Sequence, residues 1–178
     1  MPPQAEQDLE PLRYPVGRFR PDADVSAAAR TEHIRRIAAV PGRMRDAVLA
    51  VGDRLDQPYR PGGWTARQVV HHVADSHVNA YVRFRWTLTE DAPLIKTYDE
   101  AAWAELPDAR TLPVEASLIL LDALHRRWVA LLGAMDDAAF RRRLQHPEQG
   151  PVDLDFMLQL YAWHGEHHAA HLRLVAGR

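Results

Sequence analysis

The stretch Tyr161-Ala162-Trp163-His164-Gly165-Glu166-His167-His168-Ala169-Ala170-His171 holds four histidines in eleven residues. An α-helix turns once every 3.6 residues, so side chains three and four positions apart lie on the same face. One face of this segment would carry Met157, Tyr161, His164, His168, His171 and Val175. Because this spacing is typical of the core-facing side of a helix, we expect these histidines to point inward.

The rest of the chain also reads mainly as helix. Helical periodicity runs through four long segments. These are 24–51, 65–90, 113–132 and 153–175, with a shorter helix from Asp136. Pro41 interrupts the first segment, so we expect a kink near Ala38 or two helices that meet at Pro41 and Gly42. Since no segment reads as a convincing strand, the predicted fold class is all-α, with a four-helix bundle as its architecture.

Two segments fall outside the predicted helices. Residues 1–22 contain five prolines, which favour an extended N-terminal arm over a helix, and we expect disorder in the first ten. Residues 91–112 read as a long loop between helices two and three, with one short helical turn. Loops of this length often cover a functional site. We therefore predict an arm over 1–22 and a single bundle domain over 23–178.

Composition limits the classes of function. The chain has 178 residues, a net charge of −2 and no cysteine. The near balance of charge gives no electrostatic footprint for nucleic acid or an acidic membrane surface, so we expect neither as a partner. Without cysteine, a metal site would have to use His, Asp or Glu side chains. The N-terminus lacks the basic start and apolar run of a signal peptide, so the expected location is the cytoplasm.

The distribution of histidines indicates a metal site. Seven of the ten histidines fall in two windows, 71–77 and 164–171, which two packed helices could bring together. A buried imidazole must find a partner, and three or more that converge in a bundle core usually hold a metal ion. The alternative is a set of structural histidines hydrogen-bonded to Glu166, Asp75 and backbone carbonyls.

Spacing alone leaves the ligand set open. His164 and His168 have the i,i+4 spacing that places two ligands near one ion, and His167 and His171 share it. The core-facing row favours His164 and His168. The histidines of the first window all remain candidates for the third ligand, and they are His71, His72 and His77.

Four motifs carry a family resemblance. They are PYRPGGWTARQVVHHVADSH at 58–77, YDEAAW at 98–103, HRRW at 125–128 and YAWHGEHHAAH at 161–171. With these motifs, nearly all of residues 12–175 resembles the YfiT-like branch of the DinB superfamily. The resemblance implies a four-helix bundle fold. It also implies a homodimer as a possible assembly. It also implies one divalent metal ion per chain, zinc or nickel, held by His72, His164 and His168.

The resemblance further implies an enzyme that acts on small molecules. We expect transfer of a low-molecular-weight, bacillithiol-like thiol to an electrophile through a metal-bound thiolate. The alternative reaction is hydrolysis of a small substrate by metal-bound hydroxide. A non-catalytic, metal-stabilised stress-response or binding module is the alternative of another class.

A carboxylate and two polar side chains lie near the predicted ligands in the sequence. Hydrolysis usually needs a carboxylate base, and Asp75 is the nearest candidate, either as base or as a support for a ligand histidine. Arg83 and Asn79 share a helical stripe with His72. We leave both outside the predicted site, because a solvated or salt-bridged arginine is commoner.

Overall fold

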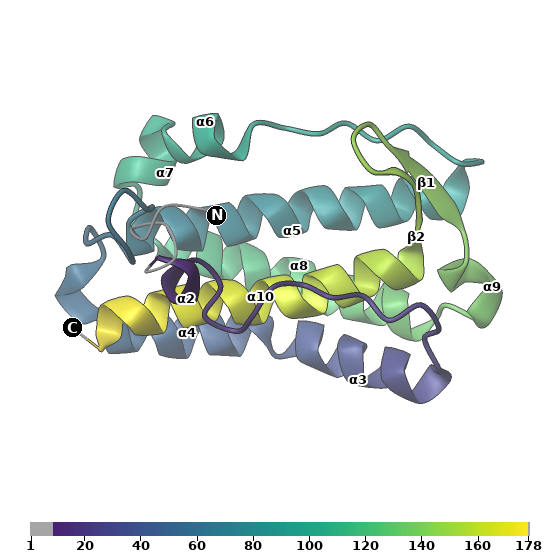
Figure 1. Cartoon of the computed structure of the whole chain (residues 1–178), viewed down its shortest axis with the longest axis horizontal. Coiled ribbons are helices and arrows are strands. Elements are labelled where there is room, and N and C mark those ends of the chain that lie inside the picture. Colours follow the sequence, from purple (N-terminus) through teal and green to yellow (C-terminus); the bar gives the residue numbers. More distant parts are fainter. Residues whose placement is uncertain (1–8, 178) are drawn as a thin grey trace.

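Four long helical stretches lie side by side in the computed structural model, which describes residues 9–177 (Figure 1). The stretches are α3 (Ala27–Ala38) continued by α4 (Val40–Val51), α5 (Ala66–Thr89), α8 (Glu115–Gly133) and α10 (Leu154–Ala176). Helix α10 packs against α3 and α4 on one side and α5 on another, and α8 completes the bundle. The predicted all-α four-helix bundle is confirmed. Along residues 9–177, every helix is too short or too polar to cross a membrane.

Local sequence signals fix where the bundle helices begin. The Thr65 hydroxyl accepts a hydrogen bond from the Gln68 backbone N–H at 3.2 Å, and the Gln68 side chain accepts one from the Thr65 N–H at 2.9 Å. Asp153 caps α10 by accepting from the Phe156 N–H at 2.8 Å. These contacts satisfy backbone donors that have no partner inside the first helical turn. They confirm the helix starts predicted from the sequence.

The first bundle helix is broken at Ala39, between α3 and α4. Pro41 lies in the first turn of α4, where its missing N–H breaks no helical hydrogen bond. The predicted division into two helices is therefore correct, but the helices meet at Ala39 rather than at Pro41 and Gly42. It places Val40 at the start of the helix that packs against α10.

A two-stranded hairpin stands at one end of the bundle, where the sequence predicts no strand (Figure 1). Strands β1 (Arg143–His146) and β2 (Gly150–Asp153) pair antiparallel. The segment after α5 joins them, since Ile95 donates its backbone N–H to the Gln145 carbonyl at 3.0 Å. The prediction was wrong because each strand has only four residues, too few for an alternating pattern to stand out.

The segment between α5 and α8 contains more helix than predicted. It forms α6 (Glu100–Ala104) and α7 (Pro107–Thr111), rather than a loop with one helical turn. Asp99 caps α6 by accepting a backbone N–H from its first turn. Both helices have only five residues, which is too short for helical periodicity to be recognised. The predicted short helix after residue 136 is present as α9 (Asp137–Phe140).

The N-terminal arm lies along α10 (Figure 1). Its first described part is not extended as predicted: α2 (Glu10–Arg13) is a short helix, with Pro11 in the first turn, where proline is tolerated. Beyond α2, Trp163 donates its indole N–H to the Gly17 carbonyl at 3.1 Å. The arm therefore covers the helix that carries four of the histidines. The sequence predicts disorder for the first ten residues, and residues 1–8 of these are outside the described part of the chain.

Helices α4 and α10 approach each other closely at Gly165. A Cβ atom there would lie 2.3 Å from Val40 Cγ2, well inside van der Waals contact. We therefore expect Gly165→Ala to lower the free energy of unfolding by about 1–3 kcal/mol, the usual cost of overpacking. Gly42→Ala is the matched control, because among residues 9–177 no atom outside the adjacent helical backbone lies within 4 Å of a Cβ at Gly42 in α4. Urea unfolding should show a clear loss for the first variant only, and equal midpoints for the two would contradict the close packing.

Candidate metal centre

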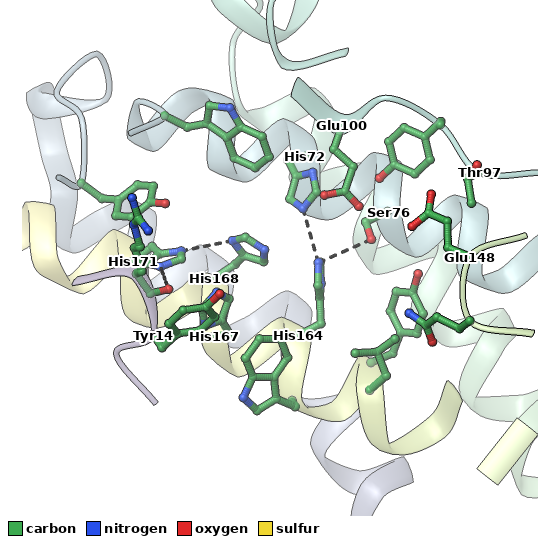
Figure 2. Close-up of a pocket in the computed structure, with 18 of the residues that line it drawn as sticks. Tyr14, His72, Ser76, Thr97, Glu100, Glu148, His164, His167, His168 and His171 are labelled. Atoms are coloured by element: carbon green, nitrogen blue, oxygen red, sulfur yellow. Dashed lines mark hydrogen bonds between the residues drawn. The ribbon is translucent and has the colours of Figure 1, made fainter. Parts of the chain in front are cut away.

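Three histidines from two facing helices converge inside the bundle. His72 comes from α5, and His164 and His168 come from consecutive turns of α10 (Figure 2). One ring nitrogen of each lies within 4.8 Å of those of the other two. The structure thus brings together the three histidines that the family resemblance selects as ligands.

The spacing of the ring nitrogens suits a metal ion. His72 Nε2 and His164 Nε2 are 3.3 Å apart. Two ligand nitrogens in a tetrahedral site lie about 3.3–3.4 Å apart, because each metal–nitrogen bond is about 2.0–2.1 Å long. Nitrogen donors without a carboxylate, as in this group, are typical ligands of zinc, nickel and neighbouring transition metals. The residues therefore fit a divalent ion of that class.

Burial keeps the three imidazoles neutral. Loss of water, and to a smaller extent the nearby His171, lowers the pKa of His72 to about 4. The same burial, and then the neighbouring histidines, hold the pKa values of His164 and His168 well below the ordinary value for histidine. A neutral imidazole has a lone pair on one nitrogen, and this is the form that binds a metal. The group can therefore coordinate an ion at neutral pH without first losing a proton.

The histidines line a cavity of about 730 Å³. Its walls include the N-terminal arm, the loop before α5, the segment before α6 and the turn between β1 and β2. Charged side chains of both signs reach it, among them Arg83, Glu100 and Glu148, of which Figure 2 shows the two glutamates. A cavity of this size accommodates a small polar molecule beside the candidate ligands.

Hydroxyl and carboxyl groups lie in the same cavity as the ligand nitrogens. Ser76 Oγ is 3.5 Å from His164 Nε2. Burial raises the pKa of Tyr98, and the negative charge of Glu100 raises it further, so Tyr98 is a neutral hydrogen-bond donor. Partial loss of water raises the pKa of Glu100, although the residue keeps an exposed surface and the positive charge of Arg83 opposes the shift. The cavity thus offers hydrogen-bond donors together with a carboxyl group that can exchange a proton.

The predicted carboxylate Asp75 does not take part in this arrangement. It is not part of the cavity wall, and within residues 9–177 its carboxylate makes no hydrogen bond to a candidate ligand. Burial, and then the charge of Asp108, raises its pKa to about 6. Glu100 and Glu148 reach the cavity instead. The nearest carboxylate along the helix is therefore not the one that the fold brings to the site.

The side chains of His71 and Glu166 have hydrogen-bond partners away from the candidate ligands. Both ring nitrogens of His71 are used outside the cavity, at 2.8 Å from Ser117 Oγ and 3.1 Å from the Leu112 carbonyl oxygen. Of the adjacent pair, His72 is the histidine that faces α10. Glu166 has its own partners away from the candidate ligands, because an arginine of α3 donates two hydrogen bonds to its carboxylate.

Arg83 belongs to the cavity wall, contrary to the prediction from the sequence. It is 8% exposed and donates to the Lys96 carbonyl at 3.0 Å. The prediction was wrong because a helical stripe does not reveal that the segment after α5 folds back over it. Tyr14, Arg60 and Glu148 also line the cavity and were not predicted. The sequence indicated only that the long segment 91–112 could cover a site. It did not indicate which side chains would point into the cavity.

A second histidine triplet overlaps the first. One ring nitrogen each of His167, His168 and His171 also lie within 4.8 Å of one another. His171 Nε2 is 3.1 Å from the Arg13 carbonyl oxygen, so this nitrogen carries a proton. His167 stacks on Trp163 with ring centroids 4.3 Å apart. Because the triplets share His168, variants of their other members can distinguish them.

Converging histidines on facing helices of a four-helix bundle define a class of helical proteins with a candidate metal centre in the core. Residues 36–172 match the sequence model of the DinB superfamily. The chain belongs to the DinB superfamily, and the family resemblance of its motifs is confirmed.

Bacterial relatives are similar over nearly the whole chain. A protein of Bacillus mycoides (strain KBAB4) named "Putative metal-dependent hydrolase" is 46% identical over 171 residues, which cover 96% of this chain and 98% of that protein. "Putative metal-dependent hydrolase YfiT" of Bacillus subtilis (strain 168) is 45% identical over 169 residues, or 94% and 95% of the two chains. A solved structure of Bacillus subtilis YfiT, described as "a probable metal-dependent hydrolase with an unusual four-helix bundle topology", matches with a TM-score of 0.91 at 45% identity, over 94% of this chain and 97% of that one. The names of these relatives agree with a metal-dependent role for the histidine cluster.

Proposed function

We propose that this protein is a metal-dependent enzyme that transfers a low-molecular-weight, bacillithiol-like thiol to an electrophile. One zinc or nickel ion per chain would be held by His72, His164 and His168. The observation that carries the proposal is a set of three neutral nitrogen donors, without a carboxylate, that opens into a cavity large enough for a substrate. This donor set leaves the charge of a divalent ion uncompensated, which favours an anionic sulfur ligand. When bound, the ion would lower the pKa of a coordinating thiol, so that the sulfur reacts as thiolate at neutral pH.

The cavity residues have separate tasks in this reaction. The thiol sulfur forms a bond to the electrophilic carbon, and the leaving group departs with the electron pair of the bond that breaks. Glu100 lines the cavity, and partial loss of water raises its pKa, so its carboxylate would accept the thiol proton. Tyr98 can donate a hydrogen bond to the departing group, and Arg83 can pair with an anionic group of the thiol.

Hydrolysis of a small substrate is the second candidate reaction. It is favoured by the names of the relatives and by the presence of Glu100 in the cavity. In hydrolysis, Glu100 rather than Asp75 would take a proton from the attacking water. A non-catalytic module is less favoured, because a structural zinc site is usually closed by four protein ligands and leaves no position for substrate.

The two reactions are separated by their dependence on thiol. The metal-loaded protein is mixed with a chromogenic haloarene and, in turn, with cysteine, glutathione and a cysteinyl sugar thiol. An aryl ester without thiol is tested in parallel. We expect metal-dependent conjugation of at least one thiol, which a chelator abolishes. Turnover of the ester alone, with no acceleration of any thiol, would reject thiol transfer in favour of hydrolysis.

Replacing Glu100 with glutamine should affect the two reactions differently. The rate of thiol transfer should fall by no more than about tenfold, because the thiol proton can also leave to water. The rate of hydrolysis should fall by about 10²–10⁴-fold, which is the usual contribution of a general base. Glu90→Gln is the matched control, because Glu90 is an exposed glutamate at the end of α5. Initial rates with saturating substrate give the comparison. A loss of thiol transfer above about 100-fold would show that Glu100 is the required base in that reaction as well.

A further inference from the structure

A chain of hydrogen-bonded imidazoles runs from the candidate metal centre through the bundle core. His164 Nδ1 is 3.1 Å from His77 Nε2, and His77 Nδ1 is 2.9 Å from His125 Nε2. His125 Nδ1 lies 2.8 Å from the carbonyl oxygen of Ile37 in α3. His77 is fully buried and His125 is 2% exposed, so water does not compete for these contacts. One line of ring nitrogens thus connects α10, α5, α8 and α3.

The direction of this relay is set by its last member. A carbonyl oxygen can only accept, so His125 Nδ1 carries a proton. Burial lowers the pKa of His125 to about 4, which means that the ring is neutral and its Nε2 can only accept. His77 is fully buried and therefore neutral, so by the same rule it donates from Nδ1 and accepts at Nε2. His164 must then donate from Nδ1, and its lone pair is left on Nε2, the nitrogen that faces His72.

A second and shorter relay ends at the N-terminal arm. His171 is 2% exposed, and an imidazole withdrawn from water in this way is neutral. His171 Nε2 lies 3.1 Å from the Arg13 carbonyl oxygen and therefore carries the proton, which makes His171 Nδ1 an acceptor. His168 Nδ1 is 3.3 Å from this acceptor. His168 must donate from Nδ1, and its lone pair is also left on Nε2.

We infer that His77, His125 and His171 are positioning residues that hold both α10 ligands in the tautomer with a free lone pair on Nε2. A histidine side chain in water carries its proton mainly on Nε2, which would prevent coordination through that atom. Because each relay ends on a backbone carbonyl, which cannot become a donor, the order of donors and acceptors cannot reverse. The inference rests on the proposed metal site, but the tautomers are a property of the metal-free protein.

Ring ¹⁵N NMR of the metal-free, full-length protein at neutral pH tests the inference directly. The proton should be on Nδ1 in four rings and on Nε2 in His171. The four rings are those of His77, His125, His164 and His168. A proton on Nε2 of His164 or His168 would overturn the inference, whatever the catalytic activity. If NMR shows the expected tautomers but the protein transfers no thiol, the inference is supported and the proposed function is rejected.

Replacing His125 separates the relay from general core stability. In His125→Gln the side-chain oxygen can still accept from His77 Nδ1, whereas His125→Leu has no acceptor. We expect His125→Leu to weaken Co²⁺ binding about 10–100-fold, the usual effect of losing a group that supports a ligand histidine, and His125→Gln to weaken it less than tenfold. The NMR spectrum of His125→Leu should also show the proton of His164 moving to Nε2.

His71→Leu is the matched control for this comparison. His71 is a buried histidine of α5 whose partners, Ser117 and Leu112, belong to neither relay. Its Co²⁺ affinity should equal that of the unaltered protein. Equal Co²⁺ affinities for His71→Leu and His125→Leu would contradict the inference. If His125→Leu does not fold, the ring tautomers of the unaltered protein decide the question.

Discussion

Replacing His164 with alanine should remove the metal ion from the protein. His164 Nε2 lies 3.3 Å from His72 Nε2, and each residue of the first triplet offers one ligand atom, so the variant leaves only two. The loss of affinity should exceed the about 10–100-fold that removal of a supporting group costs. His72→Ala should behave alike, since His72 is the ligand that α5 contributes. Metal analysis of tag-free protein should find one divalent ion per chain in the unaltered protein and almost none in either variant.

His167→Ala is the control that distinguishes the two overlapping triplets. His167 belongs only to the triplet with His168 and His171, so metal binding should persist in this variant. Loss of metal in His167→Ala with retention in His164→Ala would place the ion in the second triplet and contradict the proposed ligands. His33→Ala provides a further control, because His33 lies in α3 and is not part of the cavity wall.

The long helices could be predicted because each carries more than one independent signal. The segment that forms α10 has a core-facing stripe and a capping residue at Asp153, and α5 has a capping box at Thr65. The short elements carry no such redundancy. β1 and β2 depend on contacts such as the one between Ile95 and Gln145, which are made only after distant parts of the chain have come together. Secondary structure that tertiary contacts create in this way is invisible to a pattern of four or five residues.

The sequence predicts only those residues of the candidate site that share one face of a single helix. Spacing indicated the inward row of α10, but His71, His72 and His77 could not be ranked, because their roles depend on what the neighbouring helices offer them. In the structure, His71 is hydrogen-bonded to Ser117 and a backbone carbonyl. His72 faces α10, and His77 is hydrogen-bonded to His125. Distance along a helix also does not show which segment folds over it, and so could not show that Arg83, rather than Asp75, lines the cavity among the described residues.

An ion pair that no helical pattern indicated joins three elements near the start of α10. Arg30 of α3 is 6% exposed and donates to both carboxylate oxygens of Asp155 at 2.7 Å. It also donates to Asp137 of α9 at 2.6 Å, and its guanidinium lies 5.0 Å from the centroid of the Phe140 ring. A bidentate contact of this kind is among the strongest that an arginine makes. Arg30 therefore fixes the beginning of the helix that carries His164 and His168.

Arg30→Met should lower the free energy of unfolding by about 3–5 kcal/mol, because it leaves the Asp155 carboxylate buried without its partner. That is a large part of the about 5–15 kcal/mol that stabilises a typical domain. Asp137→Ala should cost less than about 1 kcal/mol, since the Asp137 side chain is 65% exposed and exposed ion pairs contribute little. The double variant Arg30→Met/Asp155→Leu, which buries no charge, should recover most of the lost stability. Urea unfolding compares the free energies of unfolding of the three variants. If Arg30→Met loses no more stability than Asp137→Ala, solvent rather than Arg30 compensates the charge of the Asp155 carboxylate.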